Sequence, residues 1–384
     1  MSYLFPTYQR WDIEPAKAEG SVILGKDGKE YLDFTSGIGV CNLGHRPKGV
    51  EQAVKEQLGL FWHVSNLFPQ TAQEQAAKCL AEAAGLGSVF FANSGAEANE
   101  AAIKLARKAT GRTKIISFLQ SFHGRTFAGM AATGQDKIKQ GFGSMLETFV
   151  HVPFNDIAGL EKELDIDTAA VMLEVIQGEG GIHVAEPEFL KAVEAACRKY
   201  GALLIIDEIQ TGIGRTGKPF AFQHFNLTPD LVTVAKGLGS GLPIGAVIGR
   251  VSLNKHFGPG SHGSTFGGNP VSIAAAKATM EIIFEQGFLQ QTIDKGHILF
   301  DLLEKELASL EIVKEIRGIG MMAGIEVEAE LKPLLADLRK AGLLALPAGE
   351  NVVRLLPPLT VRVQEIEKAM LIMKNAFSTA DAVS

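Results

Sequence analysis

The sequence has few cysteines and no excess of basic residues. Its 384 residues include 3 cysteines, Cys41, Cys79 and Cys197, which lie far apart and without paired spacing. This pattern argues against a disulfide framework and a zinc site, and it favours a reducing compartment. The formal net charge of −6 argues against nucleic acids and anionic membrane surfaces as general partners. We therefore expect small metabolites as its partners.

Long hydrophobic runs are also missing. No stretch reaches the roughly 18 uninterrupted apolar residues that a membrane-spanning helix needs. Residues 1–15 lack the basic segment and apolar core of a secretory leader. The expected location is the cytoplasm, with no membrane partner. At about 100–200 residues per domain, 384 residues with 46% hydrophobic content predict about two domains with a sizeable core.

Short apolar runs alternate with helical stretches through the middle of the chain. Runs that are apolar on both faces and separated by helices are typical of a mostly parallel sheet covered on two sides. In chain order the segments are VFFAN, GAEANEAAIKLARKA, KIISF, TFVHV, AAVMLEV, PEFLKAVEAACRKY, ALLIID and LVTVA. They predict an α/β fold for a large domain at residues 50–268. Before them, Thr71 and Glu74 have the spacing of a capping box, and Gly85 can close the helix that starts there.

The two ends of the chain have a different pattern. Residues 21–34 read as a hairpin whose turn, Asp27-Gly28, contains the glycine that a positive φ needs. We assign residues 1–49 to an N-terminal segment that packs with a smaller α+β domain at residues 269–384. The closing helix of that domain carries apolar residues at helical spacing, which we interpret as core. They are Ile366, Met370, Met373 and Phe377.

One lysine follows the last of the apolar runs. LVTVA leads directly into Lys236 and then into Gly237, Leu238 and Gly239. A lysine that attacks a carbonyl group needs a partly desolvated position, which lowers its pKa, and space for a flat ring. The strand end provides the first and the glycines provide the second. We interpret Lys236 as a residue that forms a Schiff base with pyridoxal phosphate; the alternative is a lysine that ends a strand and extends into water.

Polar residues follow two other apolar runs. VFFA ends at Asn93, Ser94 and Gly95, and a helix starts at once, so exposed backbone N–H groups can receive a phosphate. A plain N-cap is the alternative for this serine. ALLII ends on Asp207 and Glu208, and a buried carboxylate requires a cationic partner such as a protonated pyridine nitrogen. An aspartate that ends a strand and caps a turn is the alternative there.

Together, the three strand ends provide what pyridoxal phosphate requires. Ligands bind at the carboxyl ends of strands in α/β sheets, so we expect a phosphate anchor, a carboxylate and a lysine to meet there. Two other patterns point to no site. GIGRTG matches G-x-G-x-x-G, but KPF follows it where a dinucleotide site needs a helix. His123 and His262 lie alone in predicted loops without metal-ligand spacing, so no metal is expected.

Seven segments occur in the order found in one enzyme family. They are NSGAEANEAAIKLARK, SFHGRT, LEVIQGEGG, IIDEIQTGIGRTG, TVAKGLGSGLPIGA, HGSTFGGNP and VVRLLPPL. The sequence resembles the class III, fold-type I, pyridoxal-phosphate aminotransferases over essentially its whole length. Within that family, SFHGRT and HGSTFGGNP look most like the acetylornithine aminotransferases.

The resemblance implies roles at the cofactor. Lys236 matches the lysine that binds the cofactor covalently, Asp207 the partner of the pyridine nitrogen, and Gln210 the residue near the ring hydroxyl. Thr265 resembles the threonine that reaches the phosphate held by the neighbouring subunit, which implies a homodimer with active sites at the interface. Phe122 matches the aromatic residue that stacks on the ring. The other expected cofactor contacts are Ser94, Gly95, Ala96, Glu208 and Ile209.

The resemblance also implies a substrate site. Arg125 is similar to the arginine that grips the substrate α-carboxylate, and Ser264 to a residue that lines the substrate site. Glu179 and Arg354 resemble a pair that opens when glutamate must be accommodated. The arginine fork suits a carboxylate at a fixed point. Without the resemblance, Arg125, Glu179 and Arg354 would each be read as part of an ordinary surface or core ion pair.

The family resemblance implies a reaction. We expect transfer of the terminal amino group of N2-acetyl-L-ornithine to 2-oxoglutarate, giving N-acetylglutamate 5-semialdehyde and glutamate, a step of arginine biosynthesis. Related ornithine aminotransferases have an aromatic residue in place of His123 and tyrosine in place of Ile38, and both differences favour an acetylated donor. Ornithine, succinylornithine and succinyldiaminopimelate stay open as alternative donors. A mutase or decarboxylase on the same scaffold and a non-catalytic regulator are the rival functions, and the presence of Lys236 and Asp207 disfavours the regulator.

Overall fold

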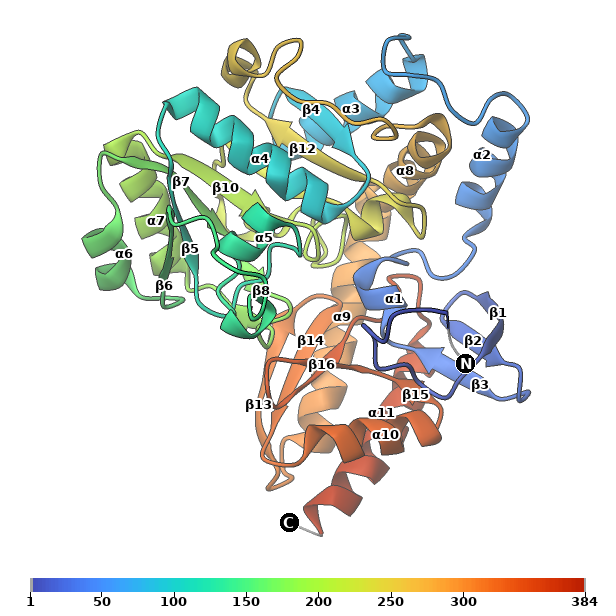
Figure 1. Cartoon of the computed structure of the whole chain (residues 1–384). Helices are drawn as coiled ribbons and strands as arrows, with labels where there is room; N and C mark the ends of the chain where they lie inside the picture. The colour runs from blue at the N-terminus through green and yellow to red at the C-terminus, as the bar shows by residue number, and fades with distance from the viewer. Residues whose placement is uncertain (1–2, 383–384) are drawn as a thin grey trace.

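A seven-stranded sheet forms the centre of the computed structural model, which describes residues 3–382 (Figure 1). Neighbouring strands run parallel except around β12, which is antiparallel to β11 and to β4. The strand order is β4 (Ser88–Ala92), β12 (Gly245–Gly249), β11 (Leu231–Val234), β10 (Leu203–Asp207), β7 (Thr168–Leu173), β5 (Lys114–Phe118) and β6 (Phe149–Val152). The expected α/β fold with a mostly parallel sheet is confirmed.

Strand β12 is absent from the sequence-based prediction, because its run, GAVIG, begins and ends with glycine, which weakens the signal of a strand. A Cβ at Gly245 would lie 2.2 Å from the Ser94 carbonyl oxygen, so glycine lets this strand pass close to Ser94, where the helix at residues 95–110 starts. Since β12 lies between β4 and β11, the strand before Ser94 is not adjacent to the strand before Lys236. Both strands run opposite to β12, so their carboxyl ends still share one edge with that of β10.

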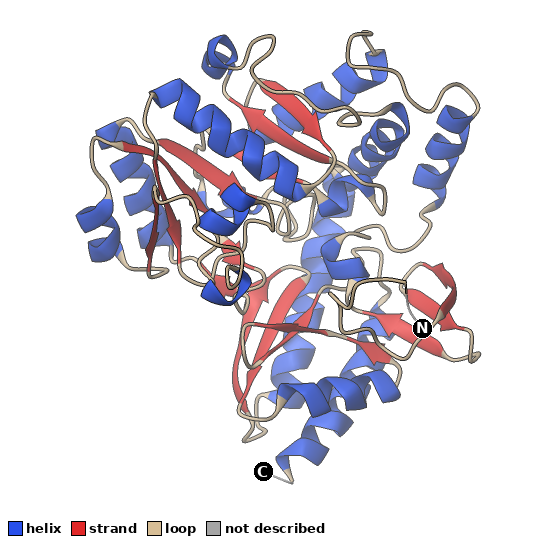
Figure 2. Ribbon diagram, in the orientation of Figure 1, coloured by secondary structure: helices blue, strands red, loops and turns tan. Residues whose placement is uncertain are grey.

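Helices cover both faces of this sheet (Figure 2). Ala170 and Met172 of β7 share a core with α4 (Gly95–Thr110), whereas Val171 and Leu173 share one with α7 (Pro187–Tyr200). Side chains of a strand alternate between faces, so a run that is apolar throughout needs a helix on each side. The sheet is also covered by α3 (Thr71–Ala84), α5 (Phe127–Ala132) and α6 (Ile157–Glu163).

The carboxyl ends of three helices follow their local sequence, whereas the start of α3 differs from the prediction. Gly85 closes α3 in the left-handed conformation, as expected, and Gly111 and Gly201 do the same for α4 and α7. The predicted capping box at Thr71 is wrong. Gln70 is the N-cap of α3, Thr71 is already helical, and no side chain caps this end.

The two ends of the chain meet in one small sheet. The predicted hairpin is present, since β2 (Val22–Gly25) pairs antiparallel with β3 (Glu30–Asp33) and with β1 (Pro15–Glu19). Strand β3 also pairs in parallel with β15 (Leu343–Leu344), so the N-terminal strands lie beside the C-terminal region (Figure 1). No helix within residues 3–382 is both long and apolar enough to cross a bilayer.

A second four-stranded sheet organises the C-terminal region, in the order β13, β14, β17, β16. The predicted core stripe of the closing helix is confirmed, because its four apolar residues are at most 2% exposed. The elements are β13 (Val313–Ile319), β14 (Met322–Val327), β16 (Leu346–Ala348), β17 (Val352–Leu355), α9 (Gln286–Leu307), α10 (Leu331–Lys340) and α11 (Val363–Asp381).

Helix α8 (Pro270–Ile283) packs on α2 (Lys48–Leu58) and α3, so contacts cross the division expected at residue 268. The proposed domains, residues 1–49, 50–268 and 269–384, stay a prediction. The remaining elements are short: α1 (Ser36–Gly39), β8 (Ile176–Gln177), β9 (His183–Val184), and the 3-10 helices η1 (Asp136–Ile138), η2 (Ala221–Phe225), η3 (Lys236–Gly239) and η4 (Val251–His256).

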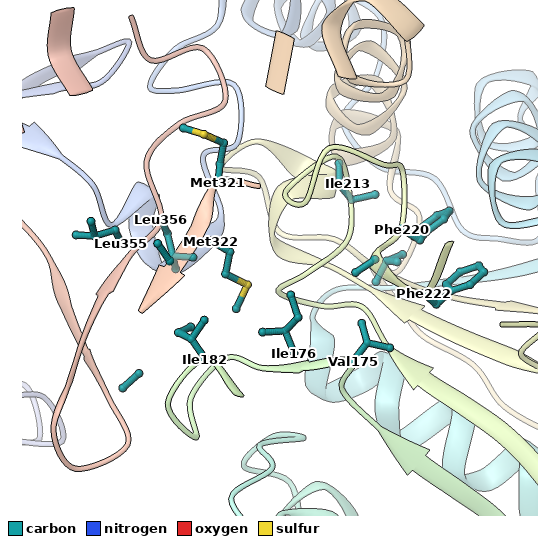
Figure 3. Close-up of a cluster of buried hydrophobic side chains, with 14 of the residues drawn as sticks. Val175, Ile176, Ile182, Ile213, Phe220, Phe222, Met321, Met322, Leu355 and Leu356 are labelled. Carbon is teal, nitrogen blue, oxygen red and sulfur yellow. The ribbon is translucent and has the colours of Figure 1, made fainter. Parts of the chain in front are cut away.

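The apolar core continues from the large sheet into the C-terminal sheet. Figure 3 shows buried side chains from three parts of the chain in one cluster, with Ile176 and Ile182 near β8 and β9, Phe220 before η2, and Met322 in β14. Removing this much apolar surface from water favours a fixed arrangement of the two sheets. The position of the C-terminal residues relative to the large sheet is therefore set by packing.

The loop GIGRTG joins three segments of the chain. The side chain of Arg215 is fully buried and donates to Oδ1 of Asn42 and to the carbonyl oxygens of Met321 and Pro357. Burial lowers the pKa of this guanidinium to about 9. The short helix η2 comes after the loop, where a dinucleotide site needs an α-helix. The loop therefore connects the N-terminal segment, the large sheet and the C-terminal region.

Candidate active site

A cavity of about 430 Å³ lies where β4, β10 and β11 end. The rest of its wall comes from the loops after β5 and β7, from Val40 and from residues 241–244. The three polar strand ends therefore meet at one cavity. Ten of the residues expected at the cofactor or the substrate line it: Ser94, Gly95, Ala96, Phe122, Arg125, Glu179, Asp207, Ile209, Gln210 and Lys236.

Lys236 lies two residues beyond the end of β11, in the left-handed conformation with φ 43°. It keeps some accessible surface because it faces the cavity, but its ammonium group is enclosed by protein. A Cβ at Gly237 would lie 2.3 Å from Nδ2 of Asn42, so glycine permits the Asn42 side chain to approach the backbone directly after the lysine. Burial lowers the pKa of Lys236 to about 8, although the charge of Glu179 opposes this shift. Near neutral pH, a much larger fraction of this amine is neutral, and therefore nucleophilic, than in an ordinary lysine with a pKa of about 10.4.

The lowered pKa of Lys236 leads to a pH-dependent prediction. Only the neutral amine attacks an aldehyde, and its fraction rises with pH through about 8. The rate at which cofactor-free protein combines with pyridoxal phosphate should rise with pH and level off above roughly pH 9, whereas an ordinary lysine, with a pKa of about 10.4, would level off above roughly 11. Stopped-flow absorbance measures this rate. A rate that still rises in proportion to hydroxide between about pH 9 and 10 would contradict the prediction.

Asp207 ends β10 and is 3% exposed. Its Oδ2 accepts a hydrogen bond from Nδ2 of Asn99 at 2.8 Å and lies 2.8 Å from Nδ1 of His123. Its Oδ1 accepts from the backbone N–H of Ile209 at 3.0 Å. Burial disfavours the charged imidazole, but the hydrogen bond from His123 to Asp207 and the charge of Asp207 outweigh it and raise the pKa of His123. These partners hold the carboxylate at the cavity wall.

The sequence analysis missed His123 and Asn99 as parts of the site. The pattern placed His123 alone in a loop, whereas it is 1% exposed and bonded to a residue 84 positions later. One signal was available in the sequence. Asn99 is a buried amide on a face of α4 otherwise made of alanine, isoleucine and leucine, and a buried amide requires a partner.

Glu174 is a third residue that the sequence analysis missed. It directly follows β7, and its carboxylate accepts hydrogen bonds from the backbone N–H of Phe122 at 2.8 Å and of Gly178 at 3.0 Å. Burial raises the pKa of Glu174 to about 7; His123 opposes this shift and Asp207 adds to it. The rule that identified Asp207, a carboxylate at the end of an apolar strand, also applies to Glu174.

The N-terminal end of α4 reaches the cavity. Oγ of Ser94 accepts from the backbone N–H of Glu97 at 3.2 Å, so this serine is an N-cap as well as a cavity residue. The N–H groups of Gly95 and Ala96 are at the first helical positions, which have no partner within the helix and favour an anion. A Cβ at Gly95 would lie 2.7 Å from the Ile209 side chain. Glycine is therefore required where the helix meets the loop after β10.

An ion pair between a buried arginine and a half-buried glutamate joins two distant parts of the chain at the cavity. Nη1 and Nη2 of Arg354 lie 2.6 and 3.2 Å from the two carboxylate oxygens of Glu179. Gln210 bridges the pair, because its Nε2 donates to Glu179 at 3.1 Å and its Oε1 accepts from Arg354 at 3.0 Å. Burial raises the pKa of Glu179, but the charge and hydrogen bonds of Arg354 outweigh it and hold this pKa below its usual value.

A second arginine lies at the rim. The guanidinium of Arg125 is 5.7 Å from the centre of the Phe122 ring, and its side chain is exposed. Arg125 thus presents its guanidinium to the cavity, whereas the guanidinium of Arg354 is paired with the cavity residue Glu179. Ile38, the position compared with tyrosine, is 46% exposed and does not line the cavity, whereas its neighbour Val40 does.

Four residues expected at the site do not line the cavity of the single chain, and one of them is Arg354, which pairs with the cavity residue Glu179. Glu208 is turned into the protein, where its carboxylate accepts from Oγ1 of Thr211 and from the backbone N–H groups of Ala221 and Phe222. Oγ of Ser264 accepts from Nδ2 of Asn93, a cavity residue, at 3.1 Å. Thr265 is exposed to solvent.

The cavity fits pyridoxal phosphate. A nucleophilic lysine, a carboxylate for the ring nitrogen, a helix N-terminus for the phosphate and an aromatic side chain, Phe122, surround one space of suitable size. His123 adds a chemical argument, since its hydrogen bond fixes the carboxylate that would face the ring nitrogen. Within residues 3–382 no group of three or more His, Cys, Asp or Glu residues is arranged to hold a metal ion.

Changing Asp207 to asparagine should affect rate more than cofactor binding. The amide keeps the shape and the contact with the Ile209 N–H, but it removes the negative charge that would stabilise a protonated ring nitrogen. We expect kcat to fall by about 10²–10³-fold, and the Kd of the cofactor to change by less than about tenfold. Steady-state kinetics and fluorescence titration measure the two. Asp156→Asn, which keeps the N-cap of α6, is the control; equal losses in kcat and binding would contradict the assigned role.

Comparisons with known proteins agree with this site. The family model described as aminotransferase class-III matches residues 6–377. The chain is 59% identical, over the whole length of both, to the acetylornithine aminotransferase of Bacillus subtilis. A structure of the N-acetylornithine aminotransferase from Stenotrophomonas maltophilia has a TM-score of 0.86 at 33% identity and covers 98% of each chain.

A second solved structure, with PLP at partial occupancy in its active site, is the ornithine aminotransferase from Toxoplasma gondii. It has a TM-score of 0.95 at 31% identity and covers 99% of this chain and 93% of its own. Since the family match, the relatives and the cavity agree, the chain belongs to the class III aminotransferases and is a pyridoxal-phosphate-dependent enzyme.

Proposed function

We propose that this enzyme transfers the terminal amino group of N2-acetyl-L-ornithine to 2-oxoglutarate, giving N-acetylglutamate 5-semialdehyde and glutamate. The observation that carries the proposal is the pair formed by the half-buried Glu179 and the buried Arg354, whose charges act on Lys236. A donor with a terminal amine must bind with that amine, and not its α-nitrogen, at Lys236. The donor's carboxylate must therefore not be attracted to Arg354, whose charge Glu179 neutralises. The acetylornithine aminotransferase from Bacillus subtilis, at 59% identity, supports the same donor.

The chain supplies the acid–base and electrostatic parts of the reaction. When bound, pyridoxal phosphate supplies an aldehyde that carries the amino group and a ring that accepts an electron pair. With the cofactor bound, Lys236 would be the base that removes the proton from the substrate carbon and the acid that returns it, a positioned transfer worth about 10²–10⁴-fold. Asp207, fixed by Asn99 and His123, keeps the ring nitrogen protonated.

Two substrates of different geometry must use the same cavity. The donor presents an amine far from its carboxylate, whereas glutamate presents an amine next to one. Arg125, which lines the cavity, holds one carboxylate of either substrate. Arg354, which is paired with the cavity residue Glu179, holds the second carboxylate of glutamate or 2-oxoglutarate once Glu179 has moved. Glu179 neutralises Arg354 while the donor is bound and must leave it when the dicarboxylic substrate binds.

A panel of donors tests the proposed substrate. The holoenzyme is assayed with acetylornithine, ornithine, succinylornithine and succinyldiaminopimelate, each with 2-oxoglutarate as acceptor. The highest kcat/KM is expected for acetylornithine. A higher value for another donor would replace acetylornithine but keep the aminotransferase. A yellow protein whose cofactor absorbance does not change with any of these amines would support the non-catalytic alternative.

We also propose a homodimer, located in the cytoplasm, with Thr265 of each subunit completing the partner's phosphate site. The support is an exposed apolar surface formed by Leu60, Trp62, Leu67 and Phe266, which are 58–89% exposed in the single chain. Large exposed apolar patches mark interaction sites. Sedimentation of the holoenzyme tests this, and a species of 41.1 kDa at working concentration would reject the dimer.

A further inference from the structure

A five-residue loop, residues 178–182, carries Glu179 between β8 and β9. Its position decides whether the Glu179 carboxylate reaches Arg354. Two of its residues have positive φ, Gly181 at 125° and Ile182 at 58°. A β-branched residue in the left-handed region is strained, and such strain persists only where the surroundings impose it. Contacts from outside the loop must therefore hold it.

The C-terminal sheet supplies those contacts. The carbonyl oxygen of Gly178 accepts from Nη1 of Arg354 at 2.9 Å, and that of Glu179 accepts from the backbone N–H of Gly349 at 2.8 Å. The carbonyl oxygen of Gly181 accepts from both Nε and Nη2 of Arg317, at 3.0 and 2.8 Å. Three of the five carbonyl groups in the loop are thus held by residues of, or next to, β13, β16 and β17.

Apolar packing holds the strained end of the loop. Ile182 is fully buried, and a Cβ at Gly324 in β14 would lie 2.8 Å from the Ile182 Cβ. Figure 3 shows Ile182 in the cluster that also contains Met322 and Leu355 of the C-terminal sheet. The loop is therefore seated on the same sheet that carries Arg354.

Arg317 differs from the other polar contacts. It lies outside the cavity, and its side chain is only 9% exposed. Its Nη1 pairs with Glu326 at 2.6 Å and with Glu315, which directs Nε and Nη2 to the Gly181 oxygen. Two hydrogen bonds from a charged, oriented group to one carbonyl make a stronger hold than a single neutral bond. Arg317 therefore restrains the loop without touching either member of the ion pair.

We propose that Arg317 is a positioning residue that sets how readily Glu179 leaves Arg354, and thereby the enzyme's affinity for its dicarboxylic substrate. This inference rests on the proposed function, in which that departure must precede binding of the second carboxylate. When the binding-competent state is populated only in part, the apparent affinity falls by the same fraction. Weakening the hold on the loop raises that fraction, so dicarboxylates bind more tightly and discrimination against α-amines weakens.

Binding of glutarate, a five-carbon dicarboxylate without a reacting group, tests the proposal in the holoenzyme. In Arg317→Met, which keeps the stem but removes the donors, the Kd of glutarate measured by calorimetry should fall about three- to tenfold. The KM for the keto-acid acceptor should fall with it, while kcat with the terminal-amine donor changes less than about twofold. Arg317→Lys should give a smaller shift in the same direction. Lys314, which lies on the same strand as Arg317, provides the matched control. Lys314→Met removes an ion pair with Glu328 and should leave the Kd of glutarate unchanged.

A double-mutant cycle separates positioning from general loosening of the fold. If Arg317 acts through Glu179, Arg317→Met should change the glutarate Kd in the wild-type background and have no further effect in Glu179→Ala. An unchanged Kd in both Arg317 variants, or an equal effect in both backgrounds, would overturn the proposal. If Glu179→Ala by itself leaves the preference between terminal and α-amines unaltered, the ion pair has no part in selection and the proposed function fails first. Thermal unfolding of each variant shows that the protein remains folded.

Discussion

Replacing Lys236 by alanine is expected to lower kcat/KM for transamination by about 10⁴-fold or more. The loss combines two effects at one residue: the amine that attaches the cofactor, and the base that moves a proton between the substrate carbon and the cofactor. Its pKa of about 8 suits both roles, because the amine is partly neutral near neutral pH and becomes charged when it takes a proton. The measurement is single-turnover kinetics with acetylornithine, followed by the absorbance of the bound cofactor.

Lys236→Arg tests whether the positive charge of Lys236 is sufficient or whether its ability to lose a proton is required. Arginine keeps a positive group at the end of β11 but cannot lose its proton in a protein. The arginine variant should therefore be as inactive as the alanine variant, although both keep the carboxylate and the helix N-terminus at the cavity. Activity within about tenfold of wild type in either variant would show that another residue acts as the base.

Replacing Glu179 by alanine is expected to have the second-largest effect, on selectivity. The change leaves the Arg354 guanidinium, which is 2% exposed, without its carboxylate partner. An uncompensated buried charge attracts any carboxylate that enters the cavity, so α-amino acids should bind in the productive pose more often. Hydrogen bonds to charged groups contribute about 1.5–3 kcal/mol, which corresponds to a loss of about 10–100-fold in the preference for terminal over α-amines.

The ratio of kcat/KM for acetylornithine to that for an α-amino acid measures this effect. Glu179→Gln should shift the ratio less, because the amide keeps one hydrogen bond to Arg354 while the charge is lost. Glu161→Ala, which removes an exposed carboxylate of α6 outside the cavity, is the control. If Glu179→Ala leaves the ratio unaltered, the ion pair is structural and does not select substrates. Thermal unfolding is needed beside the kinetics, because breaking a buried ion pair costs about 3–5 kcal/mol.

The strands of the site could be predicted because their signals are local. An apolar run that ends on Lys236 or Asp207 shows both the strand and the point where its backbone leaves the sheet, and Asn93 to Gly95 show the start of a helix. Parallel strands place their carboxyl ends on one edge, so a chain that alternates strands and helices already predicts that these ends meet. The family resemblance added Glu179, Arg354 and Arg125, which carry no local signal of function.

The neighbours of each strand in the sheet, and the direction of the side chains after it, could not be predicted in the same way. Strand β12 enters between β4 and β11, and Glu208 turns away from the cavity although it directly follows Asp207. A glutamate next in the chain projects to the other side of the backbone, and only the surrounding loops decide which of the two carboxylates faces the cavity. His123 likewise became part of the site through a single contact with Asp207.

By itself, the sequence determined the α/β class, the strand ends and, through the resemblance, the cofactor, and it predicted the residues that serve the cofactor. Only the tertiary structure decided which of these residues touch. Arg354 and Glu179 are 175 positions apart, and Arg317 reaches a carbonyl 136 positions before it. Periodicity and caps involve neighbours within one or two turns, so they can be read along the chain. Contacts across such separations depend on the order of the strands and on the packing between the two sheets, which no local pattern records.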